Sequence, residues 1–310
     1  MKKALLFLTV AICAIAFAQE SVVWDFSKPQ VQWSGLRNAT AVLVEGATCV
    51  STLARDASIV AKNLSYDPKL FSHIRFTVRY EGFETEDVNG QLYFGTEAKP
   101  SLSDAQAIYF KVKQKAGQKQ VITLAFKDVR GGNALWYQGG KVTTLRFDFA
   151  DQHPGKVYIE KIELLSKAAM QTQTVYDFSK GPQGWTIPYN MKITPEANAL
   201  KLDVTGTDCR LMNNNVCIDI EKFKHIKITY SAEGFADGNK GGEIFYASSE
   251  FNAYGKGGYV GLPQLITDGQ DHEMFVNAPW KGFGIVFAVR LDLTNAFPGV
   301  IHLKKVEFLP

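Results

Sequence analysis

Apolar and polar residues alternate along much of the chain at the two-residue spacing that a half-buried β-strand requires. In the segment 74–80 every second residue is apolar, from Ile74 to Tyr80, and the segment 226–230 repeats the phase. The i, i+3, i+4, i+7 spacing of an amphipathic helix does not persist over any appreciable length. The pattern therefore predicts an all-β fold of short strands.

The last predicted strand of each half of the chain changes phase in its middle. Apolar residues face one way up to Ile159 and continue one residue out of step from Ile162, and the segment 301–308 shows the same slip. One extra residue in the strand would bring the second apolar set back to the inner face. The slip predicts a β-bulge near Lys161 and another near Lys305.

The chain contains an internal repeat, which has to be recognised before the fold can be assigned. The offset between matched segments is 152 residues at first and 144 towards the end, so about eight residues are missing from the second copy. The matched segments include 24–28 (WDFSK) with 176–180 (YDFSK), 81–83 with 233–235 (EGF in both), and 146–148 (RFD) with 290–292 (RLD).

Ordered matches of this kind predict two homologous domains in tandem. We expect one β-sandwich of the jelly-roll type at 19–166 and another at 175–310, with a short polar linker at 167–174. Each is large enough to bury a core of its own.

The first 18 residues have the pattern of a secretory signal peptide. Lys2 and Lys3 precede an apolar run at 4–18, which ends in the small-x-small sequence Ala16-Phe17-Ala18. The run is shorter than the roughly 20 residues that a membrane-spanning helix needs, so no transmembrane segment is predicted. We expect cleavage near Ala18 and a protein that is secreted, periplasmic or on the cell surface.

Composition and charge exclude some classes of function. The 310 residues include 34 Lys and Arg against 31 Asp and Glu, a net charge of +3, and two of the cations lie in the predicted signal peptide. A nearly neutral mature chain argues against nucleic acid as a partner. With 46% hydrophobic and 21% charged residues, the composition is that of a globular protein.

Three cysteines remain after the predicted cleavage, and two of them are close in sequence. A hairpin with its loop at 211–215 would set Cys209 opposite Cys217. An exported protein could join them in a disulfide, or they could be two buried free thiols; both alternatives stay open. The spacing of the cysteines has no zinc signature.

No catalytic motif is present in the sequence. GxSxG, HExxH, Walker and GxGxxG patterns are absent, and so is the alternating acid pair that would place two carboxylates on one strand face for glycoside hydrolysis. Asp148 and Asp292 are repeat-equivalent, and we expect each to pair with the arginine two residues before it, or to cap a turn, and not to act as a base. The sequence therefore predicts no catalytic residue and a protein that is not an enzyme.

A structural calcium ion is an alternative for one acidic turn. Asp237, Asn239 and Glu243 supply the hard oxygen ligands that calcium prefers. No EF-hand pattern surrounds them, and a polar turn accounts for the same residues. No other cofactor is expected.

Aromatic residues are the candidate ligand contacts, because sugar rings present apolar C–H faces that stack on aromatic rings. Tryptophans that recur in both copies are expected in the core: Trp24 (Tyr176 in the second copy), Trp33 with Trp185, and Trp136 with Trp280. Tyrosines outside the matched segments are the predicted ligand-binding residues, and they are Tyr137, Tyr189, Tyr254 and Tyr259.

The ordered motifs resemble a known group of modules. These motifs are the opening W/Y-D-F-S, Gly206-Thr207-Asp208, Trp280, the strand 289–292 (VRLD), and Pro298-Gly299 before the last strand. Together they resemble the galactose-binding-like β-sandwich modules of secreted bacterial proteins, which are akin to carbohydrate-binding modules. The resemblance implies a non-catalytic protein whose partner is a glycan or polysaccharide.

Two other functions remain as alternatives. One is a structural or adhesive cell-envelope protein without a sugar ligand, and the other is a polysaccharide-degrading enzyme such as a lyase or glycosidase. The sequence assigns neither the sugar nor the oligomeric state.

Overall fold

The computed structural model describes residues 21–115, 117–236 and 240–310. The signal peptide predicted at 1–18 lies outside the described residues. Strands dominate the described chain, and its helices are single short turns, so the all-β prediction is confirmed. Within the described ranges, none of the helices has the length and apolarity that crossing a bilayer would need.

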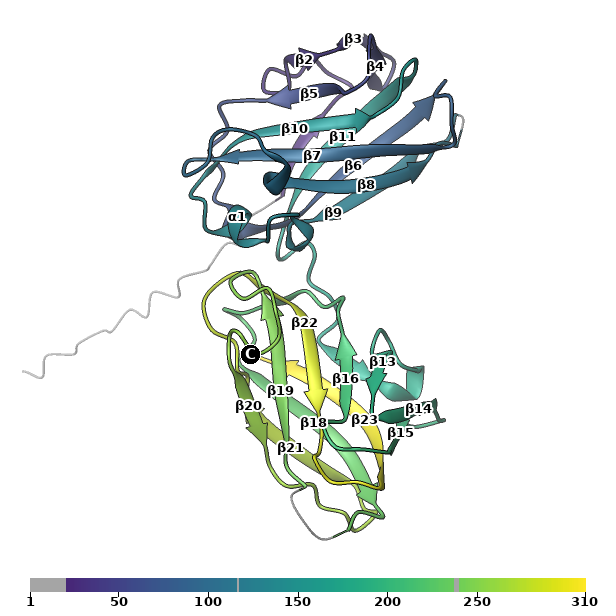
Figure 1. Cartoon of the computed structure of the whole chain (residues 1–310), viewed down its shortest axis with the longest axis vertical. Helices are drawn as coiled ribbons and strands as arrows, with labels where there is room; N and C mark the ends of the chain where they lie inside the picture. Colours follow the sequence, from purple (N-terminus) through teal and green to yellow (C-terminus); the bar gives the residue numbers. More distant parts are fainter. Residues whose placement is uncertain (1–20, 116, 237–239) are drawn as a thin grey trace, which may run out of the picture.

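Residues 22–166 form a first sandwich of two antiparallel sheets (Figure 1). One sheet has the order β3-β4-β11-β6-β9, with β1 also paired to β11, and the other has the order β2-β5-β10-β7-β8. The strands are β1 (Val22–Asp25), β2 (Gly35–Arg37), β3 (Ala39–Val44), β4 (Ala47–Thr52), β5 (Ala57–Ala61), β6 (Phe71–Glu81), β7 (Asp87–Thr96), β8 (Ala107–Lys113), β9 (Gln120–Ala125), β10 (Val142–Ala150) and β11 (Lys156–Ser166).

Residues 175–309 form a second sandwich with the same strand order. Its sheets are β14-β15-β23-β18-β21, with β12 paired to β23, and β13-β16-β22-β19-β20, with β17 paired to β22. The strands are β12 (Val175–Asp177), β13 (Ile187–Tyr189), β14 (Met191–Pro195), β15 (Leu200–Val204), β16 (Arg210–Asn213), β17 (Ile218–Asp219), β18 (His225–Glu233), β19 (Gly242–Ser248), β20 (Tyr259–Leu262), β21 (His272–Asn277), β22 (Ile285–Asp292) and β23 (Gly299–Leu309).

Short helical turns connect some of these strands. They are η1 (Pro68–Leu70), η2 (Asp104–Gln106), η3 (Phe126–Asp128), α1 (Ala134–Tyr137) and η4 (Phe178–Lys180). In Figure 1 the strands β7 and β10 run across the long axis of the molecule, whereas β19 and β22 run along it.

Both predicted β-bulges are present, one residue before the expected positions. In the pairing of β11 with β6, Glu160 is passed over between Ile159 and Lys161. In the pairing of β23 with β18, Lys304 is passed over in the same way. Each extra residue returns the apolar side chains of its strand to the core side, as the phase slip requires.

The repeated tryptophans lie in the two cores, as predicted. The Trp24 and Trp33 rings meet edge to face with centroids 5.5 Å apart, and Tyr176 and Trp185 repeat the arrangement at 5.6 Å. Trp280 Nε1 donates a hydrogen bond to the Phe223 carbonyl at 2.8 Å, so its one polar atom is satisfied. Such edge-to-face contacts add about 0.5–1.5 kcal/mol to the burial of each ring.

Polar contacts fix the boundary between the sandwiches. The buried Asn133 amide donates to the Ser248 carbonyl at 3.0 Å, and Lys167 Nζ lies between Asp219 (3.1 Å) and Glu221 (2.7 Å). These contacts join side chains of the first sandwich and the connecting segment to the second sandwich.

The hairpin predicted between Cys209 and Cys217 is not formed. Strands β16 and β17 do not pair with each other, because both pair with successive parts of β22. Both thiols are free and buried, and the Cys209 thiol lies 3.1 Å from the Thr294 carbonyl oxygen. Burial raises the pKa of Cys209 to about 11 and that of Cys217 to about 12, so both thiols stay protonated at neutral pH.

One repeated packing contact requires glycine, and it gives a test of the fold. A Cβ atom added to Gly155 would lie 2.2 Å from the Phe83 ring, and one added to Gly299 would lie 2.4 Å from the Phe235 ring. We expect Gly155→Ala and Gly299→Ala each to lower the free energy of unfolding by about 1–3 kcal/mol in urea titrations, because the ring has to move.

Gly261→Ala is the matched control, because a Cβ there would meet nothing within 4 Å. This variant should unfold within about 0.5 kcal/mol of the parent chain. Equal stability of all three variants would contradict the packing described for the glycine pair.

Candidate functional site

A row of aromatic and arginine side chains crosses the outer face of one sheet of the second sandwich. We call it the second row. In β22, Val289 and Leu291 are in the core, so strand alternation places Arg290 on the outer face. The members of the second row, in the order of the strands, are Tyr189 (β13), Arg210 (β16), Arg290 (β22), Phe245 (β19) and Tyr259 (β20).

Three neighbouring pairs in the second row are in contact, and Asp208 links the remaining pair, Arg210 and Arg290. The Arg210 guanidinium lies 4.6 Å from the centre of the Tyr189 ring, and the Arg290 guanidinium lies 4.6 Å from the centre of the Phe245 ring. The Phe245 and Tyr259 rings are 5.4 Å apart at 33°. Tyr189 is 50% exposed and Tyr259 is 59% exposed, so the row ends in two rings that are open to solvent.

Carboxylates hold the central arginine of the second row in place. Arg290 Nε donates to Asp292 Oδ1 at 2.7 Å, its Nη2 donates to Asp292 Oδ2, and Nη2 also donates to Asp208 Oδ1 at 2.8 Å. The predicted pairing of Arg290 with Asp292 is therefore correct. Because two carboxylates form hydrogen bonds with the guanidinium, its plane is held in one orientation against the Phe245 ring.

The first sandwich repeats this arrangement around Arg146. Its Nε donates to Asp148 Oδ1 at 2.7 Å, and its Nη2 donates to Asp148 Oδ2 and, at 3.3 Å, to Asp56 Oδ1. The Arg146 guanidinium lies 4.8 Å from the centre of the Tyr93 ring. The first row, in strand order, consists of Arg37 (β2), Arg146 (β10), Tyr93 (β7) and Tyr109 (β8).

The two rows differ at their edges. Arg37 stands at the repeat position of Tyr189 and pairs with Asp56 at 2.8 Å. At the other edge the Tyr109 hydroxyl donates to Asp104 Oδ1 at 3.0 Å, and Arg130 Nη1 donates to the Tyr109 hydroxyl at 3.0 Å. The first row is therefore more polar than the second.

A hollow of about 120 Å³ lies beside the first row. Asn89, Gln91, Asp56 and Asp148 are among the residues that line it, and their side chains offer hydrogen-bonding groups. The first outer face therefore combines a ring-bearing row with a small recess that has hydrogen-bonding side chains in its wall.

The central aspartates have raised pKa values. Burial raises the pKa of Asp148 to about 7, against the opposing effect of Arg146, and the neighbouring Asp56 raises it further. Burial also raises the pKa of Asp292, against the effect of Arg290. Both carboxyl groups are bound to their arginines through both oxygens, so each holds a guanidinium in position.

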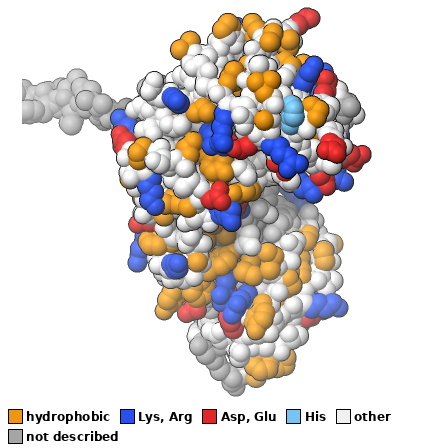
Figure 2. Space-filling model, turned by 45° about the horizontal axis from the view of Figure 1, so that its top comes forward, with side chains coloured by type: hydrophobic (Ala, Val, Ile, Leu, Met, Phe, Trp, Pro, Cys, Tyr) orange, Lys and Arg blue, Asp and Glu red, His pale blue; other side chains and the backbone are white. Residues whose placement is uncertain are grey.

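The charges of the rows are neutralised within the faces. Each arginine of the two rows, and Arg130 beside the first, lies within ion-pair distance of a carboxylate. On the side shown in Figure 2, basic and acidic side chains lie close together among hydrophobic ones. The faces therefore offer rings and hydrogen-bonding groups with little net charge.

The tyrosines predicted to bind ligand differ in position and in exposure to solvent. Tyr189 and Tyr259 are the exposed ends of the second row. Tyr254 lies at the boundary between the sandwiches, where its hydroxyl donates to Asn214 Oδ1 at 2.5 Å. Tyr137 is 2% exposed, because the short helix α1 packs it inwards together with Trp136, so it is not the exposed ring that the sequence suggests.

The calcium site predicted from the sequence cannot be assembled from the described residues alone. Asp237 and Asn239 lie outside them, and Glu243 lies on β19, two residues before Phe245. No group of three or more His, Cys, Asp or Glu side chains that could hold a metal ion occurs in residues 21–115, 117–236 and 240–310.

The sequence analysis did not assign Tyr93, Phe245, Asp56 or Asp208 to a functional site. A signal for them was present, because the offset of 152 that defines the repeat aligns Tyr93 with Phe245 and Asp56 with Asp208. Their contacts with Arg146 and Arg290 depend on which strands pair with each other. The paired strands are far apart in sequence, so the internal repeat does not reveal the pairing.

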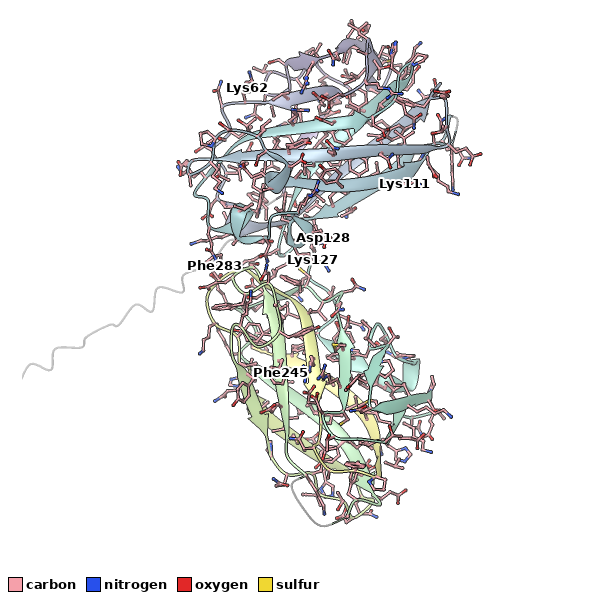
Figure 3. The ribbon with its side chains drawn as sticks, in the orientation of Figure 1. Lys62, Lys111, Lys127, Asp128, Phe245 and Phe283 are labelled. Atoms are coloured by element: carbon pink, nitrogen blue, oxygen red, sulfur yellow. The ribbon has the colours of Figure 1, made fainter. Side chains whose placement is uncertain are left out.

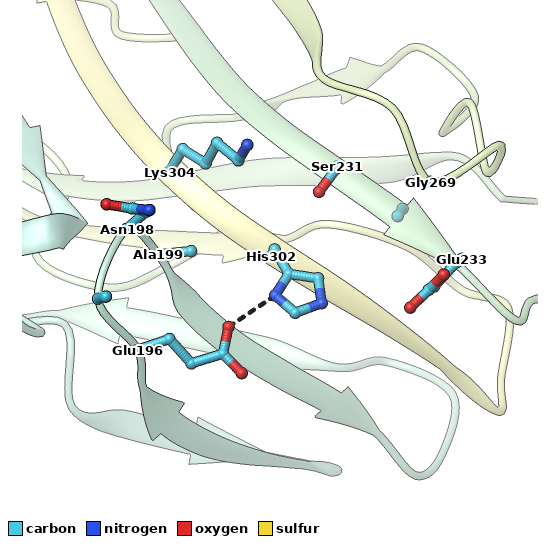
Figure 4. Close-up of a pocket in the computed structure, with 10 residues that line it drawn as sticks. Glu196, Asn198, Ala199, Ser231, Glu233, Gly269, His302 and Lys304 are labelled. Carbon is cyan, nitrogen blue, oxygen red and sulfur yellow. Dashed lines mark hydrogen bonds and ion pairs between the residues drawn. The ribbon is translucent and has the colours of Figure 1, made fainter.

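Another pocket, of about 410 Å³, lies on the opposite sheet of the second sandwich (Figure 4). Its central contact joins His302 Nδ1 to Glu196 Oε2 at 2.9 Å, and the described residues that line it include no aromatic side chain besides the imidazole. The first sandwich has Tyr158, stacked 3.9 Å from the Arg79 guanidinium, at the position of His302. This pocket is thus not a repeated feature, unlike the rows.

Comparison with known proteins finds likenesses among solved structures only. No family model matches the chain, and no curated protein matches it. A tandem of two family 22 carbohydrate-binding modules from Paenibacillus barcinonensis Xyn10C covers 94% of this chain and 99% of its own, with 12% identity and a TM-score of 0.35.

Single modules match about half of the chain. A family 29 carbohydrate-binding module covers 47% of this chain and 89% of its own, with 9% identity and a TM-score of 0.34. A family 86 module from Roseburia intestinalis, described as a low-affinity xylan-binding module, covers 48% and 98%, with 14% identity and a TM-score of 0.33.

The central ion pair of the first row gives a stability prediction. Arg146→Gln would leave the Asp148 carboxyl buried without its partner, so we expect a loss of about 3–5 kcal/mol in the free energy of unfolding at about pH 8. The loss should be smaller at about pH 5, where the carboxyl is protonated and neutral. Urea unfolding at the two pH values measures the difference.

The loss of stability is expected to shrink on acidification because folding raises the pKa of Asp148. Folding moves that pKa from 3.8 to about 7, so the stability contributed by proton binding is complete below pH 3.8 and is lost as the pH rises through about 7. Arg130→Gln, which removes an exposed ion pair, is the control and should cost no more than about 1 kcal/mol. A loss in Arg146→Gln that grows on acidification would contradict this account.

Proposed function

We propose that the chain is an exported, non-catalytic protein that binds neutral polysaccharide through the first and second rows. The observation that carries the proposal is the second row, in which aromatic rings and guanidinium groups stand on five neighbouring strands, Asp208 links the two arginines, and the row ends in two exposed tyrosines. Export is supported by the signal-peptide pattern of residues 1–18.

The chemistry of the second row suits a sugar chain. The apolar faces of pyranose rings stack on aromatic rings, and the hydroxyl groups at their edges can bond to the guanidinium and carboxylate groups alongside. Because the arginines are already neutralised by Asp208 and Asp292, the face has no surplus charge with which to recruit an acidic polymer. A neutral glycan is therefore the ligand class that fits.

The position of the acidic groups supports a binding role over a catalytic one. Glycoside hydrolysis needs two carboxyl groups facing a substrate across roughly 5–9 Å. Asp148 and Asp292 both have raised pKa values, but each is bound to its arginine through both oxygens. Each is thus engaged with a guanidinium and not arranged as one of two carboxyl groups across a substrate.

Substitutions at the ends of the second row test the proposal. We expect Tyr259→Ala and Tyr189→Ala each to weaken binding to a neutral polysaccharide roughly three- to tenfold, which is the value of one stacking contact. A glycan array first identifies the neutral glycan bound by the mature chain, and isothermal titration then measures the affinities of the variants.

Phe275→Ala is the matched control. Phe275 is 58% exposed, nearly the same as Tyr259, but it lies on β21 in the opposite sheet. Its removal should leave the affinity unchanged. The proposal fails if no neutral glycan binds, or if Phe275→Ala weakens binding as much as the two tyrosine variants do.

A structural or adhesive role in the cell envelope is the second candidate, and one observation favours it. The edge strand β3 carries the consecutive apolar residues Val42, Leu43 and Val44, and Val42 is 63% exposed. A sheet edge with exposed apolar side chains and unpaired backbone groups can pair with another strand. This edge could join one copy of the chain to another.

The edge makes a separate prediction. If β3 pairs between copies, the chain should form dimers or larger species in size-exclusion chromatography with light scattering, and Leu43→Lys should return it to a monomer. Tyr259→Ala, which leaves the edge intact, serves as the control. A parent chain that stays monomeric at high concentration argues against the second candidate.

A further inference from the structure

A groove of about 610 Å³ lies where the two sandwiches meet, outside both rows. One wall is the segment 127–132 of the first sandwich, which follows β9. The other wall carries Asn214, Asn252 and Tyr254 of the second sandwich. Figure 3 shows Lys127 and Asp128 at this junction.

The two walls of the groove are tied to each other. Lys127 Nζ donates to the backbone carbonyl of Asn214 at 2.9 Å and lies 5.7 Å from the centre of the Phe287 ring. The buried hydrogen bond from Asn133 to Ser248 adds a second link close to the same wall. Direct hydrogen bonds between the two sandwiches therefore hold the walls of the groove next to each other.

The floor of the groove continues the outer face that bears the second row. Ala247 on β19 and Ala288 on β22 are paired across the strands and line the groove. Phe245 and Arg290 lie two residues along the same strands, and side chains two residues apart share a face. Small side chains at the end of the face thus leave a hollow next to the large side chains of the row.

The opposite wall of the groove continues into the first row. Arg130 lines the groove, and its guanidinium lies 5.1 Å from the centre of the Tyr109 ring. Tyr109 is on β8, which in Figure 1 lies on the side of its sheet that is nearer the second sandwich. One residue, Arg130, therefore borders both the groove and the first row.

We propose that the groove is a third subsite, through which a single polysaccharide chain passes from the first row to the second. This inference rests on the proposed function. The Tyr254 and Phe287 rings provide apolar surface for sugar rings, and Lys127 and the Asn252 amide provide hydrogen-bond donors for their hydroxyl groups. The ligand is then one long neutral chain held along the molecule, in place of two separate short ones.

Dependence of affinity on chain length tests this subsite. Soluble xylan, mixed-linkage β-glucan and oligosaccharides of each in increasing length are titrated against the full chain. Chains long enough to reach from row to row should bind about 100-fold more tightly than the shortest ones, because the later contacts are made within one complex.

Two groove variants separate the third subsite from simple bridging of the rows. Ala288→Phe fills the floor, and Tyr254→Ala removes a ring from the wall. We expect Ala288→Phe to abolish most of the gain for long chains and Tyr254→Ala to reduce it roughly three- to tenfold, with the affinity for short oligosaccharides unchanged in both. Tyr259→Ala, in contrast, should weaken binding of short and long chains alike.

The possible results distinguish failure of the third subsite from failure of the proposed function. If long chains bind both groove variants as tightly as they bind the parent, the groove is not a subsite, while binding of short oligosaccharides leaves the proposed function standing. If no neutral oligosaccharide or polysaccharide binds, the proposed function fails and this inference fails with it. If Ala288→Phe lowers the melting temperature, Tyr254→Ala alone decides the question.

Discussion

The outer faces of both sandwiches depend on one arrangement, in which carboxylates bind an arginine whose guanidinium stacks on an aromatic ring. Arg146 and Arg290 each bind an aspartate on their own strand through two hydrogen bonds and a second aspartate from a neighbouring segment. A buried guanidinium with fewer partners would be costly, so the carboxylates and the arginine have to occur together. Around this fixed plane the rings of the adjacent strands take defined positions.

The two sandwiches keep this centre and vary the edges around it. Phe245 replaces Tyr93 above the arginine, and Tyr189 replaces Arg37 at the end of the row. Since the frame of the face is the same, edge substitutions can alter affinity without disturbing the fold. The second row has more open aromatic surface, and the first has more hydrogen-bonding groups, so under the proposed function the two faces would make different contacts with one ligand class.

Local patterns were enough to predict the strands, the repeat and the two bulges to within one residue, because alternation and phase are properties of consecutive residues. Contacts between distant strands were not predictable in this way. The pairing of β16 and β17 with β22 prevented the expected hairpin at Cys209 and Cys217. The neighbours of β10 and β22 brought Tyr93 and Phe245 to the arginines, and packing of α1 buried Tyr137, which sequence alone presented as a surface residue.

The central claim is that a neutral sugar chain lies on the outer faces that bear the two rows. A crystal structure of the chain with a bound neutral oligosaccharide tests it most directly. The account predicts sugar rings stacked on Tyr259 and Tyr189 or beside Tyr109, with hydroxyl groups close to the paired arginines. Sugar bound instead in the pocket at His302 and Glu196, with both rows empty, would contradict it.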